Sequence, residues 1–513
     1  MRRFGPLYGC AAVRRGRYGF LDIGSHSARL LVVDVDDRKR WRVVDEERAI
    51  LRLGDALASE GRLVGEIERA QAVYQTLCER ARHLGAHDSE AVGTAALRAA
   101  RDGAAFAAQL ARSAGVPLQV LSGEEEAKLG FLGAVTTLAV QHGYLCDLGG
   151  ASTELSRFRD RRLVAADSAP FGAVTLHQQF LREDLATQSQ TEAAVEHVRT
   201  LLVASVPEPE PGLPLVVLGG SFRSIAKLHQ ASMRYPFPSL HNYRMPPDAI
   251  AQLGRRLARM PLRERRKVPG LAIHRAELVP SALLIAGAIV EHLRPSEIVI
   301  SGAGLREGML YRRLRGPLPP PAEDLVGRSC ENLLFQVGEE PDPAQVALSD
   351  SLLNVLEPLL PQSGALRLGR AAARLRGIGR RVNFYDRHRH TFAMIIGARL
   401  FGVSHREQVL LAAAAAYEGP RRMRDLLSPY LDLLERGDMV LGQRLGLICA
   451  FAEALARSAP GMEAEIAVDI TPSVITLGIA GLTPPPQLPF GETERLALQF
   501  PKVFGRKLVP RYN

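Results

Sequence analysis

Cysteine is scarce in this chain of 513 residues, which contains only five. Cys10, Cys78, Cys146, Cys330 and Cys449 are scattered, with no metal-ligand spacing and no even number to pair. An odd, dispersed set is typical of reduced thiols in the cytoplasm and argues against a disulfide-stapled scaffold. We therefore predict a cytoplasmic protein in which Cys146 packs inside a buried strand.

Long apolar runs are absent as well. No stretch approaches the roughly 18 uninterrupted apolar residues that a transmembrane helix needs. The opening segment MRRFGPLYGCAAVRRGRYGF is basic and lacks the apolar centre of a signal peptide. We interpret residues 1–17 as a flexible N-terminal extension and expect no membrane partner.

Lysine is rare too: only six of the 65 basic residues are lysines, so arginine supplies nearly all of the positive charge. The formal net charge is +10, and a basic surface attracts polyanions such as nucleic acid, anionic lipid or a phosphate polymer. The planar guanidinium group matches phosphate oxygens with two parallel hydrogen bonds. Genomic base composition would explain the bulk excess as well, so the local clusters at 263–267 and 370–381 are better candidates for binding.

The length allows two to four domains. From 18 to 312, short apolar runs alternate with helical periodicity, as in the amphipathic segment 67–85, and this alternation predicts an α/β fold. The proline-rich stretch 313–324 is interpreted as a linker. Beyond it, apolar-periodic segments predict a mainly helical C-terminal domain over 325–513, with strand-like residues at 465–481.

One pattern occurs twice, as FLDIGSHSARLLVV (20–33) and as YLCDLGGASTELSRF (144–158). The matched pairs are Asp22 with Asp147, Gly24 with Gly149, Ser25 with Gly150, Ser27 with Ser152 and Leu30 with Leu155. Each copy predicts a β-hairpin whose Gly/Ser turn offers N–H and hydroxyl donors to an anion. Two such hairpins indicate a duplicated domain with a phosphate held between the copies.

Five further segments extend the pattern: AVGTAALRAARD (91–102), VLSGEEEAKLGFLGAV (120–135), PFGAVTL (170–176), VVLGGSFRSIA (216–226) and SGAGLREGML (301–310). In their order and spacing, the chain resembles the exopolyphosphatase / guanosine pentaphosphate phosphohydrolase family. This family lies within the superfamily of actin-like ATPases, sugar kinases and chaperones. The resemblance implies a duplicated actin-like core, with domains at 18–122 and 123–312, followed by the helical domain.

Two carboxylates, Asp147 and Glu154, flank the second turn. Carboxylates beside a phosphate chain are favourable only with a cation between them, and Mg²⁺ prefers one or two carboxylates plus waters and phosphate oxygens. The alternative is an aspartate that caps its own turn and a solvated strand glutamate. The resemblance favours the metal, with Asp22 as a third candidate ligand and with another divalent ion or K⁺ as alternatives to Mg²⁺.

The resemblance also implies the phosphate-binding residues. They are Ser25, His26, Ser27, Arg29, Thr94, Arg98, Gly149, Gly150, Ala151, Ser152 and Thr153. In the first copy, Arg29 occupies the position that Glu154 has in the second copy. One half would therefore supply a cationic clamp, and the other half would supply the metal. His26 replaces the usual Asn and would donate either to phosphate or within its own turn. Ala151 replaces a third Gly and fits if its φ is negative.

The segment LSGEEEAKLGFLGAV contains the candidate catalyst. Ser122 and Glu125 form a capping-box pattern that predicts a helix from Gly123. Glu125 is used by the cap, so Glu124 and Glu126 remain as candidates for the catalyst. The alternative is that these acids only stabilise the helix dipole. The resemblance implies that the glutamate directly before the alanine, Glu126, acts as the general base that activates a water for in-line attack.

The segment FYDRHRHTFAMIIG (384–397) lies where longer exopolyphosphatases resemble metal phosphohydrolases of the HD type. Asp386 precedes His388 and His390, and this segment contains no adjacent His-Asp pair. We therefore expect no second metal centre, and predict that these residues line a polyanion path or an interface.

These inferences predict an exopolyphosphatase that releases orthophosphate from the end of inorganic polyphosphate with Mg²⁺. Guanosine pentaphosphate is the alternative substrate. An actin-like phosphotransferase would need an adenosine pocket and would lack the EEEA helix, and a phosphate-polymer sensor would lack the base. We expect a homodimer and no nucleic-acid partner.

Overall fold

The structure is a computed structural model that describes residues 14–206, 208–316, 318–360, 363–458, 465–480 and 491–512. Cys10 and most of the predicted N-terminal extension lie outside these residues. The chain divides into two compact units. Unit 1 comprises residues up to 235 and 239–325, and unit 2 comprises residues 236–238 and 326–513.

The first lobe of unit 1 is built on a five-stranded sheet with the order β3-β2-β1-β4-β5. Its strands are β1 (Gly16–Ile23), β2 (Ser27–Val35), β3 (Trp41–Ile50), β4 (Asp88–Gly93) and β5 (Leu118–Val120). Its helices are α1 (Leu53–Glu60), α2 (Ile67–His83), α3 (Ala95–Ala99) and α4 (Gly103–Ala114). Helix α2 confirms the amphipathic prediction, because its buried residues, from Ala70 to Ala81, recur on one face.

The second lobe is built on a six-stranded sheet with the order β10-β11-β9-β6-β7-β8. Its strands are β6 (Gly143–Leu148), β7 (Thr153–Arg159), β8 (Arg162–Ala169), β9 (Leu215–Leu218), β10 (Arg244–Met245) and β11 (Ile298–Ile300). The helices of this part are α5 (Gly123–Val135), α6 (Ala173–Phe180), α7 (Gln188–Ser205), α8 (Gly219–Ser232), α9 (Asp248–Leu257), α10 (Leu262–Arg265), α11 (Val279–Leu293) and α12 (Leu305–Arg315).

The two lobes repeat one topology. In each, an antiparallel meander (β1-β2-β3 or β6-β7-β8) pairs its first strand in parallel with a later strand, β4 or β9. The register agrees to the residue, because Asp22 opposes Arg29 and Asp147 opposes Glu154. The turns also match: Gly24 N–H donates to Ser27 at 3.1 Å and Gly149 N–H donates to Ser152 at 3.0 Å. The predicted duplication and the actin-like α/β fold are therefore present.

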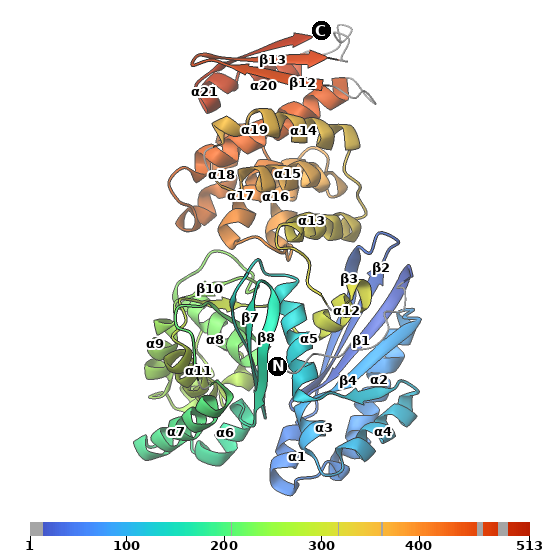
Figure 1. Ribbon diagram of the computed structural model, residues 1–513, viewed down its shortest axis with the longest axis vertical. Helices are drawn as coiled ribbons and strands as arrows, with labels where there is room; N and C mark the ends of the chain where they lie inside the picture. Colours follow the sequence, from blue (N-terminus) through green and yellow to red (C-terminus); the bar gives the residue numbers. More distant parts are fainter. Residues whose placement is uncertain are drawn as a thin grey trace. The chain divides into compact units, whose positions relative to one another are not determined.

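Helices α5 and α12 lie between the two sheets of unit 1 (Figure 1). They cross at two glycines: a Cβ on Gly133 would lie 2.0 Å from the Gly304 carbonyl, and one on Gly308 would lie 1.9 Å from that of Leu129. No side chain fits at either position, so the backbones approach closely. This contact fixes α5, whose first turn carries Glu126.

Two predicted boundaries need correction. Strand β1 begins at Gly16, so the last two residues of the predicted extension 1–17 belong to the first sheet. Helix α12 continues to Arg315, so the first three residues of the predicted linker 313–324 are helical.

Unit 2 is mainly helical. Its helices are α13 (Asp324–Val337, which starts at the unit boundary), α14 (Pro343–Val355), α15 (Ala365–Leu375), α16 (Arg387–Gly397), α17 (His405–Ala415), α18 (Pro420–Leu427), α19 (Asp438–Ser458), α20 (Gly491–Ala497) and α21 (Phe500–Phe504). A three-stranded sheet of β12 (Glu465–Ile470), β13 (Val474–Ala480) and β14 (Lys507–Tyr512) completes it. Strands β12 and β13 confirm the strand-like prediction, and β14 is a further strand within the segment that was predicted to be mainly helical.

One helix, Asp438–Arg457 within α19, is long and apolar enough to cross a membrane by length and composition, and 78% of its most apolar stretch is buried inside the fold. Core helices have the same length and composition, so this observation is weak evidence for a span. The four cysteines in the described part of the chain, Cys78, Cys146, Cys330 and Cys449, are buried free thiols. Burial raises the pKa of each of them, as expected for thiols that serve packing.

Candidate active site

Both hairpin turns border one cavity of about 160 Å³ between the lobes of unit 1. The first turn contributes Ser25, His26 and Ser27, and the second contributes Gly149, Gly150 and Ser152. The two turns lie close together, since a Cβ built on Gly150 would lie 3.6 Å from the Ser25 Cβ. Backbone N–H groups and short hydroxyls at facing turns form a concave site for an anion.

The second turn is held by helix α6. The N–H of Ala173 donates to Gly149 at 3.0 Å, and the N–H of Val174 donates to Gly150 at 2.8 Å. A Cβ on Gly172 would lie 2.4 Å from the Gly150 carbonyl carbon, so only glycine permits this approach. Ala151 is not among the residues with positive φ, and it therefore fits where a third glycine is usual.

Three carboxylates lie together at the cavity: Glu154 is buried, and Glu126 and Asp147 are half-buried. Arg98 joins two of them, donating from Nη1 to Glu126 Oε2 at 2.8 Å and placing Nη2 3.7 Å from Glu154 Oε1. Glu154 also accepts hydrogen bonds from the Ser152 hydroxyl at 2.6 Å and the Ser168 hydroxyl at 2.9 Å. The carboxylates are therefore oriented by fixed donors rather than by solvent.

The predicted helix cap is present. The Glu125 N–H donates to the Ser122 hydroxyl at 3.2 Å, and the Glu125 carboxylate accepts from the Ser122 N–H at 2.8 Å. Glu124 pairs with Lys128 at 2.7 Å, and its side chain is 54% exposed. Of the three consecutive glutamates, only Glu126 lines the cavity.

Burial raises the pKa of Glu126 well above its usual value, and the nearby Glu154 raises it further, while Arg98 opposes both effects. Burial and Glu154 likewise raise the pKa of Asp147 to about 7. Burial also raises the pKa of Asp22, against the effect of Arg29. Such shifts mark a site where a cation or a proton has to neutralise crowded carboxylates.

The donor set fits Mg²⁺. Asp147 and Glu154 oppose each other on β6 and β7, and this ion takes one or two carboxylates and completes its octahedron with waters and phosphate oxygens. Within the described part of the chain, no three His, Cys, Asp or Glu side chains are arranged to hold a metal ion by themselves. A metal here would therefore need oxygens from substrate and water.

Arginines line the rest of the cavity. They are Arg29, Arg223, Arg275 and Arg306. Burial and neighbouring arginines lower the pKa of Arg223 and that of Arg275 to about 10, so both remain charged at neutral pH. Arg306 is anchored by Leu30 O at 3.1 Å and by Glu46 at 2.5 Å. Mutually repelling guanidiniums in one cavity are stabilised by a bound polyanion.

Most residues predicted for the site lie together. Those at the cavity are Asp22, Ser25, His26, Ser27, Arg29, Thr94, Glu126, Asp147, Gly149, Gly150, Ser152 and Glu154. Burial and nearby cations, Arg275 first, lower the pKa of His26 to about 4, so its ring is neutral at pH 7.

Three predicted phosphate ligands are placed differently. Arg98 binds Glu126 and the Leu121 carbonyl, at 2.8 and 3.0 Å, instead of lining the cavity. Thr153 is fully buried and donates its hydroxyl to Phe171 at 2.7 Å, so its side chain serves the core. Ala151 is also not among the lining residues.

Sequence reasoning missed Arg275 and Arg306. Arg306 lies in the SGAGLREGML segment that carried part of the resemblance, and its position there is the signal that could have indicated it. Arg275 follows the irregular stretch 266–272 and ends a short 3-10 helix (Ile273–Arg275), and no local pattern distinguishes it from the other arginines.

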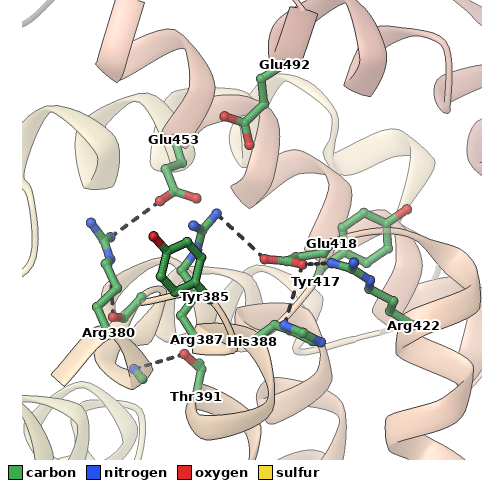
Figure 2. Close-up of polar contacts among 12 residues, drawn as sticks. Arg380, Tyr385, Arg387, His388, Thr391, Tyr417, Glu418, Arg422, Glu453 and Glu492 are labelled. Carbon is green, nitrogen blue, oxygen red and sulfur yellow. Dashed lines mark hydrogen bonds and ion pairs between the residues drawn. The ribbon is translucent and has the colours of Figure 1, made fainter. Parts of the chain in front are cut away.

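Figure 2 shows the cluster in unit 2 around the predicted path residues. His388 Nδ1 lies 3.5 Å from Glu418, and Arg387 lies 3.6 Å from the same carboxylate. Arg376 donates to Glu453 at 2.6 Å. Although burial alone would raise the pKa of Glu453, Arg376 and its neighbouring arginines lower it to about 2. The cluster is thus a set of internal ion pairs, and no metal-ligand group occurs among the described residues.

Comparison with known proteins agrees with this geometry. The sequence profile described as the Ppx/GppA phosphatase family matches residues 31–316. The crystal structure of the Aquifex aeolicus Ppx/GppA family member is 25% identical, with a TM-score of 0.51 over 57% of this chain and 96% of that chain. An exopolyphosphatase from Cytophaga hutchinsonii is 21% identical, with a TM-score of 0.55 over 58% of this chain and 98% of that chain, and shares the fold. The chain therefore belongs to the Ppx/GppA phosphatase family, whose members hydrolyse phosphoanhydride bonds.

Proposed function

We propose that this protein is an exopolyphosphatase that removes the terminal phosphate of inorganic polyphosphate as orthophosphate. The observation that carries the proposal is the placement of Glu126. Its carboxylate is held by Arg98 at 2.8 Å, at a cavity formed by two anion-binding turns and lined by arginines. A base at the inner end of a polyanion cavity is what hydrolysis of a terminal phosphate requires.

In this mechanism the two turns bind the terminal phosphate through backbone N–H groups and the Ser25 and Ser27 hydroxyls. Arg29, Arg223 and Arg275 neutralise the following phosphates. Glu126 accepts a proton from a water molecule, whose oxygen forms a bond to the terminal phosphorus as the bridging P–O bond breaks. The electron pair of that bond remains on the shortened chain.

The raised pKa of Glu126 suits this role, because a general base is most effective when its pKa lies near the working pH. Arg98 lowers the pKa of Glu126 against the effect of burial and holds its carboxylate at the cavity. Asp147 and Glu154 would hold Mg²⁺, which supplies charge neutralisation on the phosphate oxygens when bound. His26 is neutral and can donate one ring N–H to a phosphate oxygen.

The test is orthophosphate release measured in parallel from long polyphosphate, short polyphosphate, guanosine pentaphosphate and ATP, with Mg²⁺ present. We expect the highest kcat/KM for polyphosphate. Preference for guanosine pentaphosphate would replace the proposal with the alternative substrate of the same chemistry. Phosphate transfer from ATP to an added acceptor would instead indicate a phosphotransferase.

A further inference from the structure

A second and larger cavity lies in the second lobe of unit 1, apart from the active site. It is a groove of about 570 Å³, bounded by helices α6, α7, α9 and α11, which lie together in Figure 1. Pockets for small organic molecules usually have volumes of about 300–1,000 Å³ and are mostly apolar with a few polar groups. This groove has the same size and character, and the proposed hydrolysis makes no use of it.

Its floor is apolar and unfilled. Leu181, Ile250 and Leu284 contribute apolar walls. Gly254 on α9 and Gly287 on α11 face open space, because a Cβ built on either meets no heavy atom within 4 Å. Neither glycine has a positive φ, so the backbone does not require glycine at these two positions. The room is therefore available to a ligand rather than taken up by packing.

The rim of the groove is acidic although the protein is basic. It carries five carboxylates (Glu183, Asp184, Asp248, Glu277 and Glu291) and two guanidinium groups, Arg255 and Arg265. Arg199 pairs with Glu291 at 2.8 Å from outside the groove, and an excess of carboxylates remains. The whole chain has a net charge of +10. An excess of carboxylates around a partly enclosed apolar space favours a cation over an anion.

One buried donor in the groove lacks a partner. Arg265 is only 4% exposed, and its Nη2 lies 3.1 Å from Asp184 Oδ1. Its Nε has no hydrogen-bond partner among the described residues. A buried donor left in this state is unfavourable, and a ligand with a neutral oxygen acceptor would satisfy it.

Helix α6 connects the groove with the active site. Its first residues, Ala173 and Val174, bind the carbonyls of Gly149 and Gly150 in the second phosphate-binding turn. The middle of the same helix provides His177, which lines the groove and lies 3.6 Å from Glu277. A ligand that packs against His177 would therefore contact and stabilise α6, the helix that holds the turn.

We propose that this groove binds an organic cation with an apolar body and an uncharged oxygen acceptor, and that its occupation stabilises the second phosphate-binding turn through α6. The cationic group pairs with the rim carboxylates, the apolar body lies over Gly254 and Gly287, and the acceptor takes the Arg265 Nε–H. Binding at the groove does not depend on which phosphoanhydride the enzyme hydrolyses.

The test uses procaine, an aromatic ester that carries a protonated amine, with two matched molecules. Benzocaine keeps the aromatic ester and lacks the protonated tertiary amine, and 4-aminobenzoate is an anion. By isothermal titration of the full chain we expect procaine to bind about tenfold more tightly than benzocaine, which corresponds to about 1.4 kcal/mol, and 4-aminobenzoate not to bind. Equal affinity for all three, preference for the anion, or no binding of procaine would overturn the proposal.

Gly287→Leu fills the groove in a helix where leucine is favoured over glycine, so the variant should fold with an equal or higher Tm. It should lose procaine binding by at least about tenfold. The matched control is Gly65→Leu, because Gly65 also faces open space but lies outside the groove. Equal binding by Gly287→Leu and the control would place the ligand elsewhere and refute the site.

The coupling to the turn is measured by amide hydrogen exchange at Ala173 and Val174, which needs no substrate. Saturating procaine should slow exchange at both amides, since it stabilises the helix end that donates to the turn. Unchanged exchange at full occupancy would refute the coupling. Glu277→Gln should weaken procaine binding several-fold without affecting benzocaine, and an equal loss for both would contradict the charge-based recognition.

Discussion

Replacing Glu126 with glutamine removes the proposed base and leaves its position filled. The amide is isosteric with the carboxylate, so the Arg98 contact at 2.8 Å is kept, with the side-chain amide oxygen of the variant as a weaker acceptor. The amide cannot, however, take a proton from water. General-base catalysis is typically worth about 10²–10⁴ in rate, or about 3–5 kcal/mol of activation free energy. We expect kcat to fall by that factor while KM changes little.

The same substitution has an opposite effect on stability. A carboxyl group whose folded pKa is raised above its unfolded value is destabilising once ionised, so its cost grows as pH rises. Glu126→Gln removes one charge from the group of three carboxylates at the cavity. The largest repulsion that this removes is the one between Glu126 and Glu154. We expect a higher Tm for the variant, with a larger gain at pH 8 than at pH 5.

The matched control is Glu124→Gln, on the same helical turn. Glu124 is 54% exposed and pairs only with Lys128, an exposed i,i+4 contact worth roughly 0.3–0.5 kcal/mol. Steady-state phosphate release and thermal unfolding of both variants decide the matter. Near-normal turnover of Glu126→Gln, or equal losses in both variants, would refute the assignment of the base.

The site and unit 2 support three other predictions. Asp147→Asn and Glu154→Gln should each raise the Mg²⁺ concentration that gives half-maximal rate, and an unchanged titration in both would return them to a structural role. Arg98→Gln should lower kcat and move the acid limb of the pH–rate profile to higher pH, because Arg98 lowers the pKa of Glu126; a lower kcat with an unmoved limb would argue for phosphate binding instead. In unit 2, the pKa of Glu453 falls to about 2 from an unfolded value of about 4.5, so its interactions with Arg376, Arg457 and Arg380 together contribute about 3 kcal/mol. That stability should be fully present above about pH 4.5 and lost as pH falls toward about 2, and Glu453→Gln should flatten this part of the unfolding curve measured by denaturant titration.

The hairpins and the helix cap could be predicted because each depends on a few neighbouring residues. The duplicated α/β fold could be predicted because the hairpin pattern occurs twice. The turn residues Gly24 and Gly149 and the cap at Ser122 define local geometry without help from the rest of the chain. The paired positions Asp22/Arg29 and Asp147/Glu154 then followed from equal spacing in the two copies, and the strand register agrees.

Side-chain partners could not be predicted in the same way. The sequence indicates a phosphate clamp at Arg98, but the contacts of this residue with Glu126 and Leu121 depend on how α3 meets α5. Thr153 lies beside a turn residue, but strand alternation points it into the core. Strand β14 contains Pro510 and basic residues, which the sheet accepts because β14 is an edge strand paired in parallel with β13.

The central claim is that water activated by Glu126 attacks the terminal phosphorus of polyphosphate. The most direct measurement is polyphosphate hydrolysis in water labelled with heavy oxygen, with mass analysis of the released orthophosphate and of the remaining chain. We expect one labelled oxygen in each orthophosphate, none in the shortened chain, and loss of this release in Glu126→Gln. Label in the remaining chain, or unlabelled orthophosphate, would contradict the account.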